Sequence, residues 1–145
     1  MKNFKYMSLM VALLSVLTLS FTSCSSDDDD EITNIASSTI TLHEVNIEGS
    51  QICVKADIAC PNKVEYIRIE IYSADGQTRK FTQDFYSSKY TGALNIPEFH
   101  EHLLDIDTYD PAIVEGDLLE FTVVDINGNS TTVQKNLTEE EDDEL

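Results

Sequence analysis

The stretch VEYIRIEIYSADG, residues 64–76, has the clearest structural pattern in this 145-residue chain. Isoleucines at 67, 69 and 71 alternate with polar and aromatic side chains. Because successive side chains of a β-strand point to opposite faces of its sheet, this period of two predicts a strand that is buried on one face. Asp75-Gly76 follows at once, and this dipeptide favours a tight hairpin turn because it tolerates a positive φ. The stretch therefore predicts an antiparallel sheet with one face in a core.

The same alternation recurs along the chain, and no segment of residues 39–137 has helical periodicity. A second turn signal, Asn127-Gly128, separates two of the alternating segments. We expect seven strands, at about residues 39–45, 52–58, 64–73, 78–85, 90–106, 118–126 and 130–137. Seven short strands with turns between them predict an all-β fold, an immunoglobulin-like antiparallel β-sandwich of about seven strands in a single domain.

The N-terminal residues have the pattern of a secretory signal. Lys2 and Lys5 precede an apolar run from Met7 to Leu19, and small polar residues lead to Cys24. The run is about 13 residues long, whereas a membrane-spanning helix needs roughly 20. We therefore expect a signal peptide over residues 1–23.

Residues 21–24, Phe-Thr-Ser-Cys, resemble the cleavage region of a bacterial lipoprotein signal, although Phe21 stands where leucine is usual. The resemblance implies that Cys24 carries the lipid and anchors the protein to a membrane; an ordinary secreted protein is the alternative. Residues 25–31, SSDDDDE, contain no apolar side chain that could be buried. Their five acidic side chains repel one another. We expect residues 24–38 to form an extended acidic tether.

Two resemblances extend this interpretation. The run Ser26, Asp27, Asp28, Asp29 and Asp30 resembles the export signal of surface lipoproteins in Bacteroidota, with a solvating spacer as the alternative. The stretches EGSQICVKADI (48–58), VEYIRIEIYSADG (64–76), FHEHLLDI (99–106) and EGDLLEFTVVDINGNSTT (115–132) resemble a family of small immunoglobulin-like lipoproteins from Bacteroidota whose function is unassigned. This family implies an outer-membrane protein that is lipid-anchored and faces the cell exterior.

The charge balance limits the possible partners. The chain has 27 acidic against 9 basic residues, a formal net charge of −18. Nucleic acids and anionic headgroups are bound by clusters of Lys and Arg, and this sequence contains no such cluster. We therefore expect no nucleic-acid partner and membrane contact only through the lipid anchor. The acidic C-terminal residues 138–145 are predicted to be a disordered tail.

The sharpest chemical pattern is FHEHLLDID, residues 99–107. On a strand, His100 and His102 project from one face, and Glu98 precedes them on that face. Two imidazoles with a carboxylate can bind zinc, and His43 could supply a further ligand from the first strand. The alternative is that both histidines lie on a solvated sheet face.

Calcium is a weaker possibility. A group of acidic residues follows the histidines where the sandwich should turn, namely Asp105, Asp107, Asp110, Glu115 and Asp117. Calcium prefers six to eight oxygen ligands, but this spacing matches no known loop, so a solvated acidic loop is the alternative. Residues 125–129, DINGN, superficially resemble a calcium loop and are explained by the Asn-Gly hairpin.

Tyrosines form the third candidate site. Tyr66 and Tyr72 lie opposite the isoleucine row and flank Arg68, and Tyr86 and Tyr90 follow in the next connection. Tyrosine on a rigid sheet suits recognition of a protein or a glycan, although cross-strand packing of tyrosines is also common.

No pattern of a catalytic nucleophile or of a phosphate-binding loop is present, so we do not expect an enzyme. A disulfide between Cys53 and Cys60 is not expected either, because a continuous strand would hold them about 23 Å apart. The sequence thus favours a surface-exposed lipoprotein that acts as a non-catalytic binding or accessory module. A metal-binding domain and a structural subunit of a surface complex are the alternatives.

Overall fold

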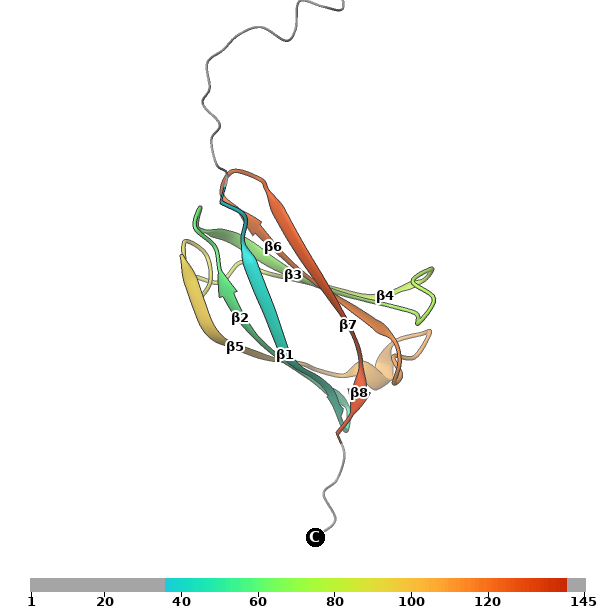
Figure 1. Cartoon of the computed structure of the whole chain (residues 1–145). Coiled ribbons are helices and arrows are strands. Elements are labelled where there is room, and N and C mark those ends of the chain that lie inside the picture. Colours follow the sequence, from blue (N-terminus) through green and yellow to red (C-terminus); the bar gives the residue numbers. More distant parts are fainter. Residues whose placement is uncertain (1–35, 141–145) are drawn as a thin grey trace, which may run out of the picture. The chain divides into compact units, whose positions relative to one another are not determined.

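The computed structural model describes residues 36–140, which form a sandwich of two four-stranded sheets (Figure 1). The elements are β1 (Thr39–Glu48), β2 (Gln51–Ala59), β3 (Val64–Tyr72), β4 (Arg79–Phe85), β5 (Asn95–Leu103), the 3₁₀ turn η1 (Ile106–Thr108), β6 (Leu118–Asp125), β7 (Ser130–Asn136) and β8 (Thr138–Glu139). Each of the seven expected strands overlaps one of β1 to β7, and β8 is additional. The prediction of an all-β sandwich is confirmed.

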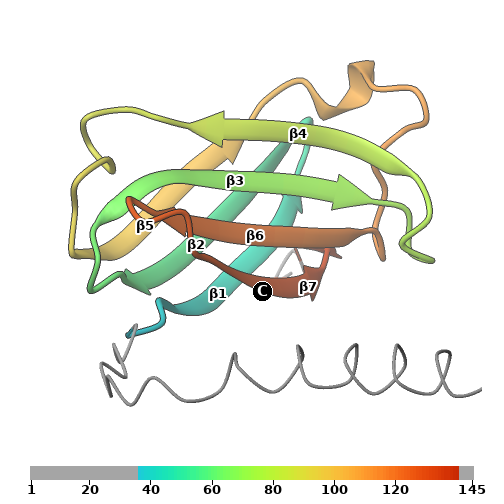
Figure 2. The ribbon, with the colours of Figure 1, turned by 90° about the horizontal axis from the view of Figure 1, so that it is seen from above.

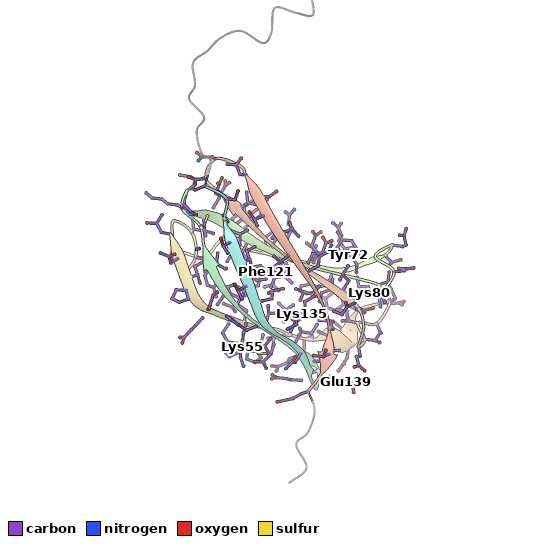
Figure 3. The ribbon with its side chains drawn as sticks, in the orientation of Figure 1. Lys55, Tyr72, Lys80, Phe121, Lys135 and Glu139 are labelled. Carbon is purple, nitrogen blue, oxygen red and sulfur yellow. The ribbon has the colours of Figure 1, made fainter. Side chains whose placement is uncertain are left out.

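Each sheet combines strands that are distant in the sequence. Sheet A has the order β5-β2-β1-β8, and sheet B has the order β4-β3-β6-β7. All pairs of the seven long strands are antiparallel. Figure 2 shows sheet B in front, with the strands of sheet A crossing behind it at an angle. Lys55 lies on the outside of sheet A, and Phe121 lies between the sheets (Figure 3).

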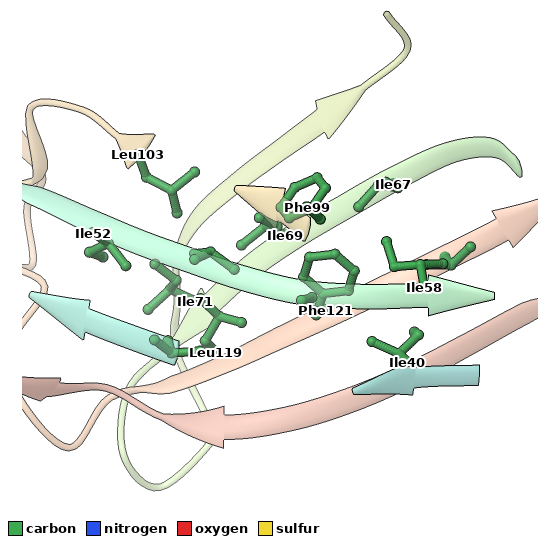
Figure 4. Close-up of a cluster of buried hydrophobic side chains, with 14 of the residues drawn as sticks. Ile40, Ile52, Ile58, Ile67, Ile69, Ile71, Phe99, Leu103, Leu119 and Phe121 are labelled. Carbon is green, nitrogen blue, oxygen red and sulfur yellow. The ribbon is translucent and has the colours of Figure 1, made fainter. Parts of the chain in front are cut away.

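The core consists of the inner faces of both sheets, as the alternation predicts. On β3, Ile67, Ile69 and Ile71 are fully buried. Sheet A contributes the apolar residues of β2, Ile52, Val54, Ala56 and Ile58 (Figure 4). Burial of a side chain of this size stabilises the fold by about 1.5–3 kcal/mol, so these rows hold the two sheets together.

An aromatic cluster joins the sheets at the centre of the core. Phe99 of β5 meets Phe121 of β6 edge to face, with ring centroids 5.1 Å apart. Phe85 and Tyr90 pack on the same Phe99 ring, at 5.8 and 5.0 Å. Edge-to-face pairs add about 0.5–1.5 kcal/mol beyond the area they bury. The packing of Phe99 on these rings therefore fixes β5 against sheet B.

Two segments differ from the expectation. Residues 90–106 do not form one extended stretch, because the strand covers only Asn95–Leu103 and Tyr90 lies in the preceding turn. There the Tyr90 ring is buried, and its hydroxyl donates a hydrogen bond to Glu101. Strand structure also continues past Leu137, since Thr138 and Glu139 pair with β1 in parallel. The prediction of a disordered tail from residue 138 is thus wrong at its first two residues, and residues 141–145 lie outside the described part.

Both predicted glycine turns are present. Gly76 and Gly128 have φ values of 73° and 82°, the left-handed region that glycine enters without steric cost. At the second turn, Asp125 accepts hydrogen bonds from the backbone of Asn127 and Asn129 and from the side chain of Asn62. Asp125 therefore has a structural role in the hairpin.

A buried ion pair holds the connection between β5 and β6. The Lys80 ammonium contacts both carboxylate oxygens of Asp117, at 2.7 and 3.0 Å, and the side chains are only 9% and 3% exposed. Lys80 also donates to the carbonyl of Ala112, and Asp117 accepts from the backbone N–H of Val114. The loop is thus attached to β4 through charged groups that are largely shielded from water.

Replacing Lys80 with methionine should lower the free energy of unfolding by about 3–5 kcal/mol, because Asp117 would be left as an uncompensated buried charge. Urea denaturation monitored by circular dichroism measures this loss. The matched control is the double variant Lys80→Met/Asp117→Leu, which removes both charges and should recover most of the stability. Equal losses in the single and double variants would contradict this role of the pair.

Candidate metal centre

The outer face of sheet A places polar side chains of three strands in a regular grid. The cross-strand pairs are Glu44 with Lys55, Asn46 with Cys53, Glu48 with Gln51, Cys53 with His102 and Lys55 with His100. Cys53 is the centre of this grid. Although it faces outward, its neighbours cover it so completely that it is only 1% exposed.

The phase of each strand determines which side chains reach this face. On β5, Phe99 and Leu103 are buried in the core, so the alternation turns His100 and His102 outward. On β2, the buried Ile52 and Val54 flank Cys53 in the same way. The prediction that the two histidines share a face is therefore correct.

Three donor atoms converge here. The Cys53 Sγ lies 3.3 Å from the His100 Nε2, and the two imidazole rings have centroids 4.9 Å apart. The sulfur and one nitrogen of each ring all lie within 4.8 Å of one another. Ligands of a tetrahedral zinc, at bond lengths of about 2.0–2.3 Å, are separated by about 3.5 Å. The three side chains thus match a metal site after small rotations.

The thiol is protonated before a metal arrives. Burial, together with the nearby Glu48 and Glu44 carboxylates, raises the pKa of Cys53 to about 11. A metal is bound by the thiolate, so binding must release this proton. The surrounding negative charge favours a cation at the same place.

His43 does not join this group. It lies at a β-bulge of β1, between Leu42 and Glu44, and its Nε2 is 2.8 Å from Oδ2 of Asp57. Asp57 also accepts a hydrogen bond from the backbone N–H of Glu98, and these two bonds lower the pKa of its carboxyl group. The sequence predicted His43 as a further ligand beside the two histidines. The structure places Cys53 there instead.

Glu98 is displaced from the histidine row by a second bulge. Its φ is 60°, and the pairing of β5 with β2 shifts in register between Ala56 and Ile58. His43, Asp57 and Glu98 instead line a hollow of about 500 Å³, which His100 borders on the side of the donor group. The two bulges therefore create a concave surface next to the candidate metal centre.

The tyrosine-bearing face of sheet B is only partly assembled. Tyr66 stacks on Tyr86 with ring centroids 5.0 Å apart, and Arg68 lies 5.4 Å from the Tyr66 ring. Asp84 binds Arg68 through two hydrogen bonds of 2.6 and 2.8 Å, which lower the pKa of the Asp84 carboxyl. Tyr72 lies at the other end of β3, roughly 20 Å away. The predicted face of Tyr66, Arg68 and Tyr72 thus offers two stacked tyrosines and an arginine whose charge is already paired.

The structure does not gather the acidic side chains predicted for calcium into one group. The Asp117 carboxylate already forms an ion pair with the Lys80 ammonium. Within residues 36–140, the donor groups close enough for a metal contain none of the other four acids predicted for calcium, Asp105, Asp107, Asp110 and Glu115.

The predicted lipid-attachment residue Cys24 and the predicted export signal, Ser26, Asp27, Asp28, Asp29 and Asp30, lie outside the described residues, as does the signal peptide. In the part of the chain that the structure covers, no helix is long and apolar enough to cross a membrane. Both Cys53 and Cys60 are free thiols.

Comparison with known proteins adds support for the fold alone. No protein-family model matches the sequence, and no curated protein matches it. The domain is similar to part of the crystal structure of wild-type OgpA from Akkermansia muciniphila, with a TM-score of 0.50 and 12% sequence identity. The match covers 68% of this chain and 27% of OgpA. The β-sandwich is thus shared with a much longer protein.

Alkylation of Cys53 by iodoacetamide in the folded, metal-free protein should be very slow at pH 8 and should accelerate up to about pH 11. With a pKa of about 11, only about 0.1% of Cys53 is thiolate at pH 8, and the thiolate is the reactive form. Peptide mass spectrometry follows Cys53 separately from Cys60. The urea-unfolded protein is the control and should react near the ordinary thiol pKa of about 8.5. A rate in the folded protein that levels off at this lower pH would contradict the raised pKa.

Proposed function

We propose that this protein is a lipid-anchored, non-catalytic binding module of the cell surface and that its ligand is a zinc-like transition metal. The single observation that carries the metal assignment is the convergence of Cys53, His100 and His102, whose donor atoms lie within 4.8 Å of one another. The three residues come from two strands that pair in the structure and are far apart in the sequence.

The donor types favour zinc over the harder cations. Zinc is a borderline-soft ion that takes thiolate and imidazole ligands, whereas calcium and magnesium take oxygen ligands. Both histidine rings are exposed, so an ion can reach them from solvent. The buried thiol beneath them supplies the strongest ligand of the group once its proton leaves.

A rigid sheet suits tight binding. The donors project from the paired segments of β2 and β5, and the core contacts of Phe99 and Leu103 hold the backbone beneath them. Little ordering is then required when the ion arrives, which favours affinity. Metal bound across β2 and β5 would also tie these two strands together and stabilise the sandwich.

The location rests on the N-terminal residues. The resemblance of residues 21–24 to a lipoprotein signal and the acidic run from Ser26 to Asp30 support an outer-membrane protein that faces the exterior. The lipid anchor would hold the sandwich near the membrane, and the tether would keep it away from the anionic surface. A protein or glycan partner in the same location remains an expectation from the tyrosine face.

The full-length protein should bind one zinc ion per chain, and saturating zinc should raise its midpoint of thermal unfolding by several degrees. A ligand at 100 times its dissociation constant adds about 2.7 kcal/mol when it binds only the folded state. Cys53→Ser and His100→Ala/His102→Ala should abolish this shift, as measured by differential scanning calorimetry after chelator treatment. His43→Ala is the matched control and should retain it. A zinc shift that survives Cys53→Ser would contradict the proposed site.

Deleting residues 27–30 should leave the protein lipidated and membrane-bound but hidden from protease added to intact cells, because the proposed export signal is removed. Immunoblotting of fractionated, protease-treated cells measures both properties. Replacing Cys24 with alanine is the control and should release the protein from the membrane fraction. Full protease sensitivity of the deletion variant would show that the acidic run is only a spacer.

A further inference from the structure

A second group of donors shares the Cys53 thiol. The Sγ of Cys53 also lies within 4.8 Å of carboxylate oxygens of Glu44 and Glu48, which are themselves within this distance of each other. Both glutamates belong to β1, and both are diagonal neighbours of Cys53 in the grid on sheet A. The thiol is therefore flanked by two imidazoles on one side and two carboxylates on the other.

Glu44 is already engaged. Its carboxylate forms an ion pair of 2.5 Å with Lys55 and accepts a hydrogen bond of 3.0 Å from the amide of Asn46. The hydrogen bond from Lys55 is the main cause of the lowered pKa of Glu44. Moving this carboxylate onto a metal would break both contacts and leave Lys55 without its partner.

Glu48 differs from Glu44 in its contacts. In the described part of the chain, no lysine, arginine or histidine forms a salt bridge with it. It is the last residue of β1 and precedes Gly49, whose φ of 62° begins the turn into β2. The Glu48 side chain is only partly buried and has three rotatable bonds, so its carboxylate can turn from the thiol toward the imidazoles.

We propose that Glu48 is the fourth ligand, so that Cys53, His100, His102 and Glu48 together enclose one zinc ion. This proposal rests on the proposed function and deepens it. Four protein ligands complete the tetrahedron that zinc adopts in closed sites, whereas catalytic zinc sites keep one position for water or substrate. The site therefore holds or sequesters its metal and does not present it to a substrate.

The ligand set also gives the metal a mechanical effect. Glu48 lies on β1, Cys53 on β2, and both histidines on β5. A single ion would thus join three neighbouring strands of sheet A across their outer face. Lys55 would remain with Glu44 beside the centre, where its charge lies next to the thiolate without ligating the metal.

The test compares two substitutions that remove the same charge from the same face. In the full-length protein, Glu48→Gln should weaken zinc binding by about 10–100-fold or more, measured by competition with a chromophoric chelator. Glu44→Gln should change the affinity less than about threefold. With cobalt(II) as the probe, the visible absorption typical of four-coordinate cobalt should be intense in the wild type and in Glu44→Gln, and much weaker in Glu48→Gln.

Three results would overturn the inference or its basis. If Glu48→Gln binds zinc as tightly as the wild type while Cys53→Ser does not bind, Glu48 is not a ligand but the proposed function stands. If Glu44→Gln and Glu48→Gln lose affinity equally, the carboxylates act only through their charge. If Cys53→Ser binds as tightly as the wild type, the proposed function fails as well. Equal unfolding temperatures of the metal-free variants establish that each substitution leaves the fold intact.

Discussion

The packing of Phe99 against Phe121 is the interaction on which the rest of this structure depends. Phe99 is fully buried, and its ring meets Phe121 of the opposite sheet at 5.1 Å. With that side chain inside, the period of the strand turns His100 and His102 outward and brings Glu101 under Tyr90. A register slip of one residue would bury the histidines and expose the phenylalanine, so the core packing fixes the geometry of the candidate metal centre.

Two β-bulges then separate the hollow on the outer face of sheet A from the regular grid around Cys53. One lies in β1 at His43, and the other lies in β5 near Glu98. They flank Asp57, which binds both the His43 ring and the backbone of Glu98. Without the bulge in β5, Glu98 would continue the outward row of His100 and His102; without the bulge in β1, His43 and Glu44 could not both face outward. The extra residues redirect them, and the regular part of the grid is left to Cys53, its glutamates and the two histidines.

Much of the architecture could be read from local patterns. Three features depend only on neighbours within one strand or hairpin. They are the isoleucine row of β3, the two turns at Asp75-Gly76 and Asn127-Gly128, and the common face of His100 and His102. Such features were predicted because the alternation of a strand and the left-handed turn of glycine are decided by nearby residues. The tight turn that buries Tyr90 was missed, since only the aromatic cluster of the core explains it.

Period-two alternation and turn residues act locally, so the order of the amino acids is enough to predict an all-β sandwich and two histidines on one outward face. Which strand lies beside these histidines depends on how the two sheets pack. Cys53 was visible as an outward residue of its strand, but no local signal shows that β2 pairs with β5 while β3 and β4 cross to the other sheet. That pairing is set by the burial of both inner faces at once, and it alone places the thiol within reach of the imidazoles.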